Sequence, residues 1–214
     1  MLKRGDRFYA PSFETKVNFI EKVKYTDLIV RKKPSDLPSI TEIKEKNNLP
    51  KEYYYVHVGG AKIEQPLFEM FKKTLPKFKD KFFVVSSNFS TSKIIEEENM
   101  RIFPFVNNAS ELIKASNGVV CPAGHSSMSE NIVFKKPMLV IPIRNHVEQM
   151  ANAAIAKSEG FGIPCFLDRK ISVPVLKHHI DNFFATRDKI EDNLKSSGFR
   201  GRGAEPVSYT HLTL

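Results

Sequence analysis

The side chains of this sequence that are best suited to chemistry lie between residues 124 and 130. An apolar run at residues 118–121, typical of a strand, breaks at Pro122 and Gly124, and a polar helix start follows. Glycine lets the backbone come close to a ligand, and the first turn of a helix presents unpaired N–H groups at its positive dipole end. The segment therefore predicts a phosphate cradle made of Gly124, His125, Ser126, Ser127 and Met128.

Glu130 adds a second kind of chemistry to this cradle. Its carboxylate lies too deep in the helix to repel a bound anion strongly, and an acceptor at that distance suits the hydroxyl groups of a sugar. Ser126 and Ser127 can donate their hydroxyl groups to phosphate oxygens. The combination predicts a site built for a nucleotide sugar.

A second strand and helix follow the cradle at close spacing. Lys136 and Pro137 lead into an apolar strand at residues 138–142, and the next helix begins near Glu148. Together with the cradle, this order of residues resembles the donor-binding signature of two-domain, GT-B-fold glycosyltransferases, in particular the MurG-like branch of the family 28 type and its archaeal relatives. The resemblance is carried by Gly124, Ser127, Glu130, Pro137, Pro142, Glu148, Gln149, Asn152 and Gly160.

The resemblance implies sugar-binding roles for the second helix. Glu148 and Gln149 would form hydrogen bonds with hydroxyl groups of the donor sugar, and Asn152 follows one turn later on the same face. The alternative is an exposed polar first turn, since the helix dipole favours Glu there in any protein. His125, directly after the key glycine, either contacts the diphosphate or is an ordinary solvated histidine at a helix start.

Two further segments match the family at the ends of predicted strands. Gly59 and Gly60 end a strand at the edge where ligands of open α/β sheets bind. Ala61 stands where relatives often have Ser, so backbone N–H groups alone would serve there, and a tight turn that needs glycine is the alternative. Phe105 and Val106 correspond to a pair that offers backbone groups to the uracil edge, unless Phe105 belongs to the core.

Strand and helix patterns alternate along the chain. This predicts an α/β fold with a Rossmann-like parallel sheet and helices on both faces, the C-terminal half of a GT-B fold. The helix near residue 108 would begin with Asn108, a residue favoured as an N-cap. Strands are expected at 53–58, 82–86, 101–103, 118–121 and 138–142, and helices at 64–75, 108–115, 148–158, 173–184 and 187–195.

The chain divides into three expected parts. Residues 1–50 would hold a remnant of an N-terminal acceptor domain, with a strand near 6–11, and a charged, proline-containing interdomain linker at 30–38. Residues 51–205 would form the nucleotide-sugar donor-binding domain. Residues 206–214 resemble the translation of a sequencing adaptor, so we expect a gene fragment with a non-native tail.

Composition limits the partners of the chain. Its 214 residues, 41% of them hydrophobic, suffice for a real core, and no apolar run is long enough to span a bilayer. No secretory signal is visible, so we expect a cytoplasmic location, at most peripheral on the inner membrane face. The formal net charge of +9 is spread over doublets such as Lys135 and Lys136, which indicates solvated helix faces and no nucleic-acid partner.

No metal ion or cofactor is expected besides the nucleotide-sugar substrate. The sequence has no Asp-x-Asp pair of the kind that holds Mn²⁺ on a diphosphate, His57 lies within a strand, and no other histidine has a partner at metal-ligand spacing. A helix dipole, backbone N–H groups and Lys62 or Arg144 would then stabilise the leaving group. Cys121 and Cys165 are expected to be buried, reduced and structural.

These features, with the resemblance, predict the donor-binding part of a glycosyltransferase. It would transfer a hexosyl group, with N-acetylglucosamine as one candidate, from a UDP-sugar to an acceptor hydroxyl. The acceptor class considered is a lipid-linked or cell-envelope glycan. The resemblance implies that the general base and the acceptor site lie on the N-terminal domain, so this fragment alone is expected to be inactive. Two alternatives remain, namely the donor-binding subunit of a split glycosyltransferase and a GT-B-fold UDP-sugar epimerase.

Overall fold

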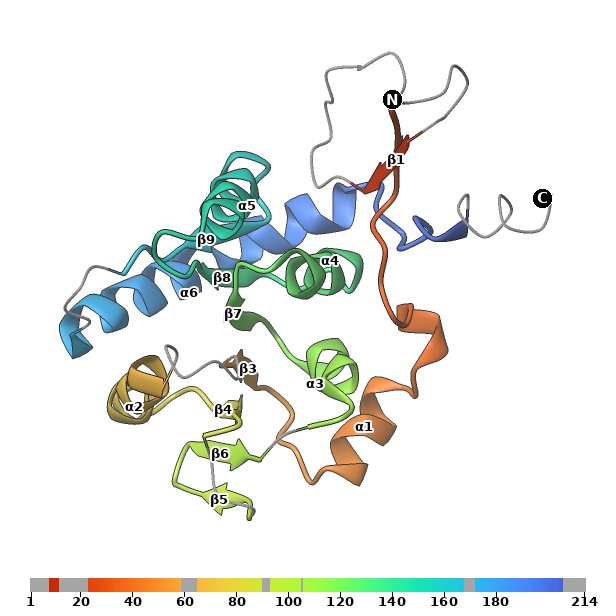
Figure 1. The fold of residues 1–214 in the computed structure, drawn as a ribbon. Helices are drawn as coiled ribbons and strands as arrows, with labels where there is room; N and C mark the ends of the chain where they lie inside the picture. The colour runs from red at the N-terminus through yellow and green to blue at the C-terminus, as the bar shows by residue number, and fades with distance from the viewer. Residues whose placement is uncertain are drawn as a thin grey trace.

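The computed structural model describes residues 8–11, 23–58, 65–89, 93–104, 106–167 and 172–205, with the backbone alone at 8–11 and 23–25. At its centre lies a seven-stranded sheet of order β5-β6-β4-β3-β7-β8-β9, in which β5 alone runs antiparallel to its neighbour (Figure 1). The expected α/β fold with a largely parallel sheet is confirmed. The strands are β3 (Tyr54–His57), β4 (Phe83–Ser86), β5 (Ile95–Glu96), β6 (Met100–Phe103), β7 (Val119–Pro122), β8 (Met138–Ile141) and β9 (Gly162–Pro164).

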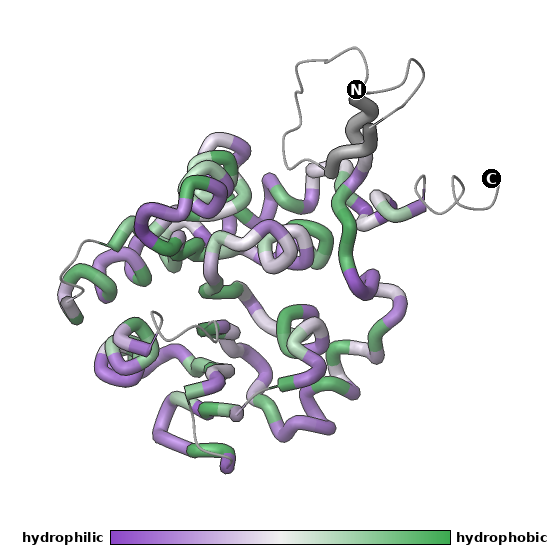
Figure 2. Tube along the Cα trace, viewed as in Figure 1, coloured by the Kyte–Doolittle hydropathy of each residue, from purple (hydrophilic) through white to green (hydrophobic). Residues whose placement is uncertain are grey.

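Helices cover both faces of this sheet. In Figure 1, α2 lies on one side and α3 and α4 lie on the other, while α6 contacts α2 and α1 packs on α3. Figure 2 shows helices that alternate between hydrophobic and hydrophilic residues, as expected where one helical face is buried. The helices within the described ranges are α1 (Ile40–Lys46), α2 (Gln65–Thr74), α3 (Ala109–Ala115), α4 (His125–Val133), α5 (Val147–Ser158) and α6 (Val173–Ser196).

Aromatic side chains form the core between the sheet and α6. The ring centroid of Tyr54, on β3, lies 4.7 Å from that of Phe184 and 6.2 Å from that of Phe183, both on α6. Phe83, on β4, joins the same cluster at 6.4 Å from Phe184. Gly118 precedes β7 and permits this close packing, because a Cβ atom there would come within 2.9 Å of Phe183. The cluster therefore fixes α6 across the middle of the sheet.

The opposite face of the sheet is held to α3 and α4. Tyr53, directly before β3, donates its hydroxyl group to the carbonyl of Leu112 on α3 at 2.7 Å. Met128 and Ile132 lie one turn apart on α4 and are both fully buried. This packing brings the start of α3 close to α4 at the carboxyl edge of the sheet.

The secondary structure departs from the expected pattern at several elements. The two helices expected at 173–184 and 187–195 are one helix of 24 residues, α6, because neither Gly nor Pro interrupts the chain between them. The sequence analysis does not predict β5 and β9, which have two and three residues and are too short for a periodic pattern. It also misses α1, which begins with a capping box between Ser39 and Glu42.

The segment before α1 crosses the molecule as a strap. It follows β2 (Val23–Thr26), which pairs in parallel with β1 (Phe8–Pro11), the strand expected near residues 6–11. From residue 27 to residue 38 the chain has no regular structure apart from the 3-10 turn η1 (Pro34–Asp36), and we call these residues the strap. Figure 1 shows the strap, in orange, passing α4 and α3 before it reaches α1.

Candidate functional site

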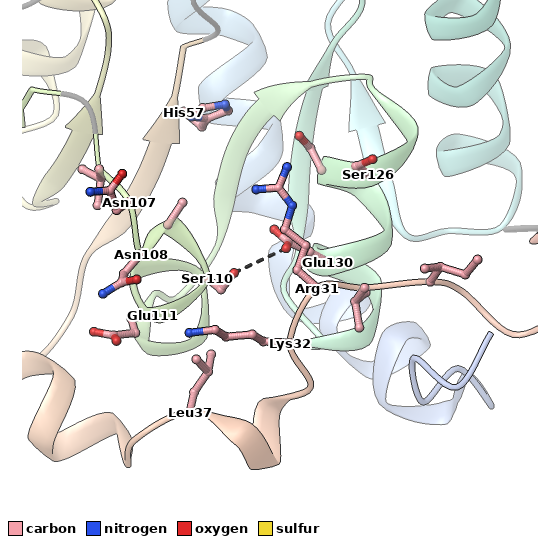
Figure 3. A pocket seen from close by; sticks show the side chains of 15 residues that line it. Arg31, Lys32, Leu37, His57, Asn107, Asn108, Ser110, Glu111, Ser126 and Glu130 are labelled. Carbon is pink, nitrogen blue, oxygen red and sulfur yellow. Dashed lines mark hydrogen bonds between the residues drawn. The ribbon is translucent and has the colours of Figure 1, made fainter. Parts of the chain in front are cut away.

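The order of the strands creates a crevice between β3 and β7. From β3 the chain moves outward through β4 to β6, and it then returns to the other side of β3 with β7 and moves outward through β8 to β9. In open α/β sheets, ligands bind beyond the carboxyl ends of the strands at such a reversal. A cavity of about 550 Å³ lies here, bordered by His57 at the end of β3 and by residues of α4 (Figure 3).

Four segments of the chain line this cavity. They are His57, residues 106–111 at the start of α3, Ser126, Ser127 and Glu130 on α4, and Ile29, Val30, Arg31, Lys32 and Leu37 of the strap. The structure thus brings together four of the residues expected from the sequence, Val106, Ser126, Ser127 and Glu130. It adds four charged or titratable residues that were not expected in the site, Arg31, Lys32, His57 and Glu111.

Glu130 is the acidic group at the centre of this arrangement. Its Oε1 accepts a hydrogen bond from the hydroxyl of Ser110, on α3, at 3.3 Å. Burial raises the pKa of the Glu130 carboxyl above its usual range, while the Ser110 hydrogen bond and the charge of Arg31 act in the opposite direction. Figure 3 shows the Arg31 side chain reaching into the cavity beside Glu130. The half-buried carboxylate and the exposed guanidinium group therefore lie close together.

The start of α4 has the geometry of an anion site. Gly124 is its N-cap, and a Cβ atom built there would meet nothing within 4 Å, so open space lies beside the backbone. The N–H groups of the first helical turn have no partner inside the helix. Met128 was also expected in the phosphate cradle, but its side chain is buried in the core and its N–H donates to the Gly124 carbonyl at 3.1 Å. Neither group of Met128 is available to a ligand.

The start of α5 lies next to that of α4. Burial lowers the pKa of His125, and the negative charge of the exposed Glu148 acts in the opposite direction. The Nδ1 atom of His125 lies 3.3 Å from the hydroxyl of Ser129. Neither His125 nor Glu148 borders the cavity. They lie close to each other, at the starts of α4 and α5.

Gln149 and Asn152 support the loops around the site. The Oε1 atom of Gln149 accepts a hydrogen bond from the backbone N–H of Ile143 at 2.9 Å, after β8. The buried Asn152 donates its side-chain amide to the carbonyl of Ala123 at 3.0 Å, in the turn between β7 and α4. Asn152 is therefore committed to the backbone of that turn, and its role as a direct contact to a sugar is not supported by its position.

His57 and Arg31 show where sequence reasoning fell short. His57 closes β3 as an ordinary strand residue, but its Nδ1 lies 3.3 Å from the hydroxyl of Ser86, which is 2.6 Å from the hydroxyl of Tyr55. Burial lowers the pKa of His57 and so favours its neutral imidazole form. Arg31 lies in the segment expected to be a linker, and its position directly after an apolar pair is a weak signal.

Other expected residues lie elsewhere or cannot be placed. Gly59, Gly60, Ala61, Lys62 and Phe105 fall outside the described residues. Asn108 occupies the N-cap position of α3, but its side chain makes no capping hydrogen bond. Arg144, expected near the leaving group, borders a separate hollow together with Val147, Met150 and Phe166.

The buried lysine and cysteine side chains have structural surroundings. Lys136 does not lie on a solvated helix face as expected, because it donates to the carbonyl of Ser116 at 2.7 Å and burial lowers its pKa to about 8. Cys121 and Cys165 are free and buried, as expected, and burial raises the pKa of each thiol to about 12. Within the described ranges, no three His, Cys, Asp or Glu side chains gather as a possible metal site.

Comparison with known proteins identifies the family. Residues 44–202 match the family model of the glycosyltransferase family 28 C-terminal domain, which is well over half of the chain. The chain belongs to this family. The expected MurG-like, family 28 resemblance is thereby confirmed.

Family 28 relatives include both archaeal and bacterial proteins. An uncharacterized glycosyltransferase of Methanosarcina acetivorans is 31% identical over 153 residues, which are 68% of this chain and 38% of the relative. A UDP-N-acetylglucosamine–N-acetylmuramyl-(pentapeptide) pyrophosphoryl-undecaprenol N-acetylglucosamine transferase of Fusobacterium nucleatum is 31% identical over 141 residues, which are 62% of this chain and 40% of that protein. This family 28 chain spans about two fifths of the length of these relatives.

Solved structures confirm the GT-B fold of the family 28 chain. Spinosyn forosaminyltransferase superimposes with a TM-score of 0.63 at 12% identity, over 93% of this chain and 52% of that protein. The O. sativa protein Os79 superimposes with a TM-score of 0.60 at 14% identity, over 82% of this chain and 44% of that protein.

None of the described helices is long and apolar enough to cross a membrane.

Proposed function

We propose that this chain is the donor-binding part of a glycosyltransferase that transfers a hexosyl group from a UDP-sugar to an acceptor hydroxyl. The observation that carries the proposal is the cavity at the reversal between β3 and β7, where Glu130 and the first turn of α4 face the same space. A nucleotide sugar offers both kinds of group that these elements recognise, hydroxyls for a carboxylate and a diphosphate for a helix start.

In this proposal, different residues of the cavity contact the ribose, the diphosphate and the base of the nucleotide. The Glu130 carboxylate accepts hydrogen bonds from the ribose hydroxyls, and Ser126 and Ser127 donate to the diphosphate. Arg31 adds a permanent positive charge against the same phosphates, because a guanidinium group binds phosphate oxygens through two N–H groups. The backbone at Val106 faces the uracil edge.

The donor sugar extends from the diphosphate toward the junction of α4 and α5. His125 and Glu148 lie there, and Glu148 is exposed and available to sugar hydroxyls. Gln149 contributes its amide N–H₂ group, since its oxygen is already bonded to the backbone of Ile143. This arrangement separates nucleotide recognition inside the cavity from sugar recognition at the starts of α4 and α5.

The chemistry proposed for the chain is stabilisation of the leaving group without a metal ion. When the bond between the sugar and the diphosphate breaks, negative charge develops on the phosphate oxygens. The α4 dipole, its free N–H groups and Arg31 then stabilise this charge in a partly dehydrated site. The general base and the acceptor site are supplied from outside this chain, and the proposed acceptor is a lipid-linked or cell-envelope glycan.

Calorimetric titration of the chain with UDP tests the proposal. Replacement Glu130→Ala should weaken UDP binding by about 1–3 kcal/mol, the usual cost of losing hydrogen bonds to a charged group. The control is Glu98→Ala, which removes an exposed carboxylate that pairs with Lys79 away from the cavity. Equal UDP affinity of the Glu130→Ala variant and the parent would exclude the ribose role of Glu130.

A further inference from the structure

The strap forms the wall of the cavity that faces α4, and it carries Arg31. Apart from η1 it has no regular hydrogen-bond pattern of its own, so other parts of the chain must hold its backbone in place. An exposed ion pair joins Lys33 of the strap to Glu205 at 2.8 Å, and two further charged side chains, one near each end of the strap, form several hydrogen bonds with the backbone.

Lys114 holds the end of the strap that leads to α1. This residue lies in the last turn of α3, and its ammonium group donates to the carbonyls of Pro34 at 2.8 Å, Leu37 at 3.1 Å and Pro38 at 2.7 Å. An ammonium group has three N–H donors, so all three are used on this one segment. The same helix presents Ser110 to Glu130 at its other end. Helix α3 therefore contacts the strap through Lys114 and the cavity residue Glu130 through Ser110.

Asp27 holds the end of the strap that follows β2. Its Oδ1 accepts from the N–H of Leu28 at 2.7 Å, and its Oδ2 accepts from the N–H groups of Arg200 and Arg202, each at 2.9 Å. The N–H of Gly203 donates to the carbonyl of Leu28 at 3.1 Å, and Gly203 has no room for a side chain because a Cβ atom would collide with the Asp27 carbonyl. The carboxylate thus ties the strap to residues 200–203.

We propose that Lys114 and Asp27 are positioning residues that fix the strap so that Arg31 is held in the cavity before the donor diphosphate arrives. A flexible strap would have to be ordered when the ligand binds, and that loss of conformational entropy would weaken binding. Fixed at both ends, the strap presents Arg31 beside Glu130 in the free protein. This inference rests on the proposed function, because it assumes that a nucleoside diphosphate occupies the cavity.

The first measurement does not depend on any ligand. Trypsin cleaves after Arg31 and Lys32 only when the strap backbone detaches, so cleavage at these two bonds reports how firmly the strap is held. Lys114→Met should accelerate this cleavage roughly tenfold, and Asp27→Asn should do the same from the other end. The matched control is Lys44→Met, since the ammonium group of Lys44 also donates to a backbone carbonyl, but that carbonyl belongs to Lys51, outside the strap.

The second measurement reads the effect on phosphate binding. Lys114→Met should weaken UDP binding roughly tenfold and leave binding of uridine, which lacks phosphate, unchanged. In an Arg31→Ala background, Lys114→Met should have no further effect on UDP, because it acts through Arg31. Circular dichroism of each variant checks that it is folded. If the Lys114→Met variant does not fold, the same binding measurements are made on Asp27→Asn.

The outcomes separate this inference from the proposed function. Unchanged strap cleavage in both variants would overturn the inference, whatever the protein binds. Faster cleavage with equal weakening of UDP and uridine would also overturn it, because the loss would then be general and not exerted through Arg31. If the parent chain binds neither UDP nor a UDP-sugar, the proposed function falls, and the cleavage rates still decide whether Lys114 and Asp27 hold the strap.

Discussion

The side-chain amide of Asn152, on α5, donates a hydrogen bond of 3.0 Å to the backbone carbonyl of Ala123, in the turn that opens α4. Both groups are buried, and Ala123 has no exposed surface. The hydrogen bond therefore joins α5 to the turn that precedes α4. It also explains why an Asn is needed at a position that the sequence suggests is a sugar contact.

Asn152→Ala should destabilise the protein. The replacement leaves the Ala123 carbonyl buried without its partner, and such a loss costs about 1–3 kcal/mol. Urea unfolding monitored by circular dichroism measures this change in the free energy of unfolding. A variant of unchanged stability that binds UDP normally but has lost affinity for the UDP-sugar would instead restore the direct sugar contact for Asn152.

Gly124→Ala should weaken ligand binding and lower stability only slightly, by the difference between Gly and Ala as N-cap residues. At this position φ is −71° and ψ is 140°, which alanine adopts freely, and no protein atom lies within 4 Å of the added Cβ. The added methyl group would instead occupy space that the diphosphate needs. Thermal unfolding and UDP titration measure the two effects separately.

Gly198→Ala is the matched control for this prediction. Gly198 also has nothing within 4 Å of an added Cβ, and it lies in the segment after α6, outside the cavity. It should change neither UDP affinity nor the melting temperature by much. If the Gly124→Ala variant binds UDP as tightly as the parent, the phosphates do not approach the backbone at residue 124.

UDP affinity should fall as the pH is lowered through the titration of Glu130. Burial raises the pKa of this carboxyl, so protonation begins at a higher pH than for an exposed Glu. The ionised form accepts hydrogen bonds from ribose hydroxyls at both oxygens, and the protonated form loses part of this capacity. Affinity is therefore retained above the pKa of Glu130 and lost below it.

Glu130→Gln isolates this effect from titration of the phosphates of UDP. The amide does not ionise, so the difference between the two pH profiles, measured by calorimetry from pH 7 downward, belongs to Glu130. The profile of the parent should be the steeper of the two. Parallel profiles would mean that the carboxylate does not contact the ligand.

The local part of the site follows from the sequence. The spacing of Gly124, Ser127 and Glu130 fixes their positions on one helix start, because helical geometry depends on neighbouring residues alone. The same holds for the β7 to α5 region, whose strands and helices lie close to the expected ranges. These features need no knowledge of distant contacts.

Tertiary structure alone decided which of these polar groups border the cavity. Arg31 and His57 border the cavity because the strap crosses the sheet edge and because β3 lies beside β7, and neither pairing is encoded by local periodicity. Gln149 and Asn152 both have the polarity of ligand contacts, but the Oε1 atom of Gln149 and the side-chain amide of Asn152 form hydrogen bonds with backbone groups of other loops. The sequence determines what a side chain can bind, and long-range packing determines which partner lies within hydrogen-bonding distance.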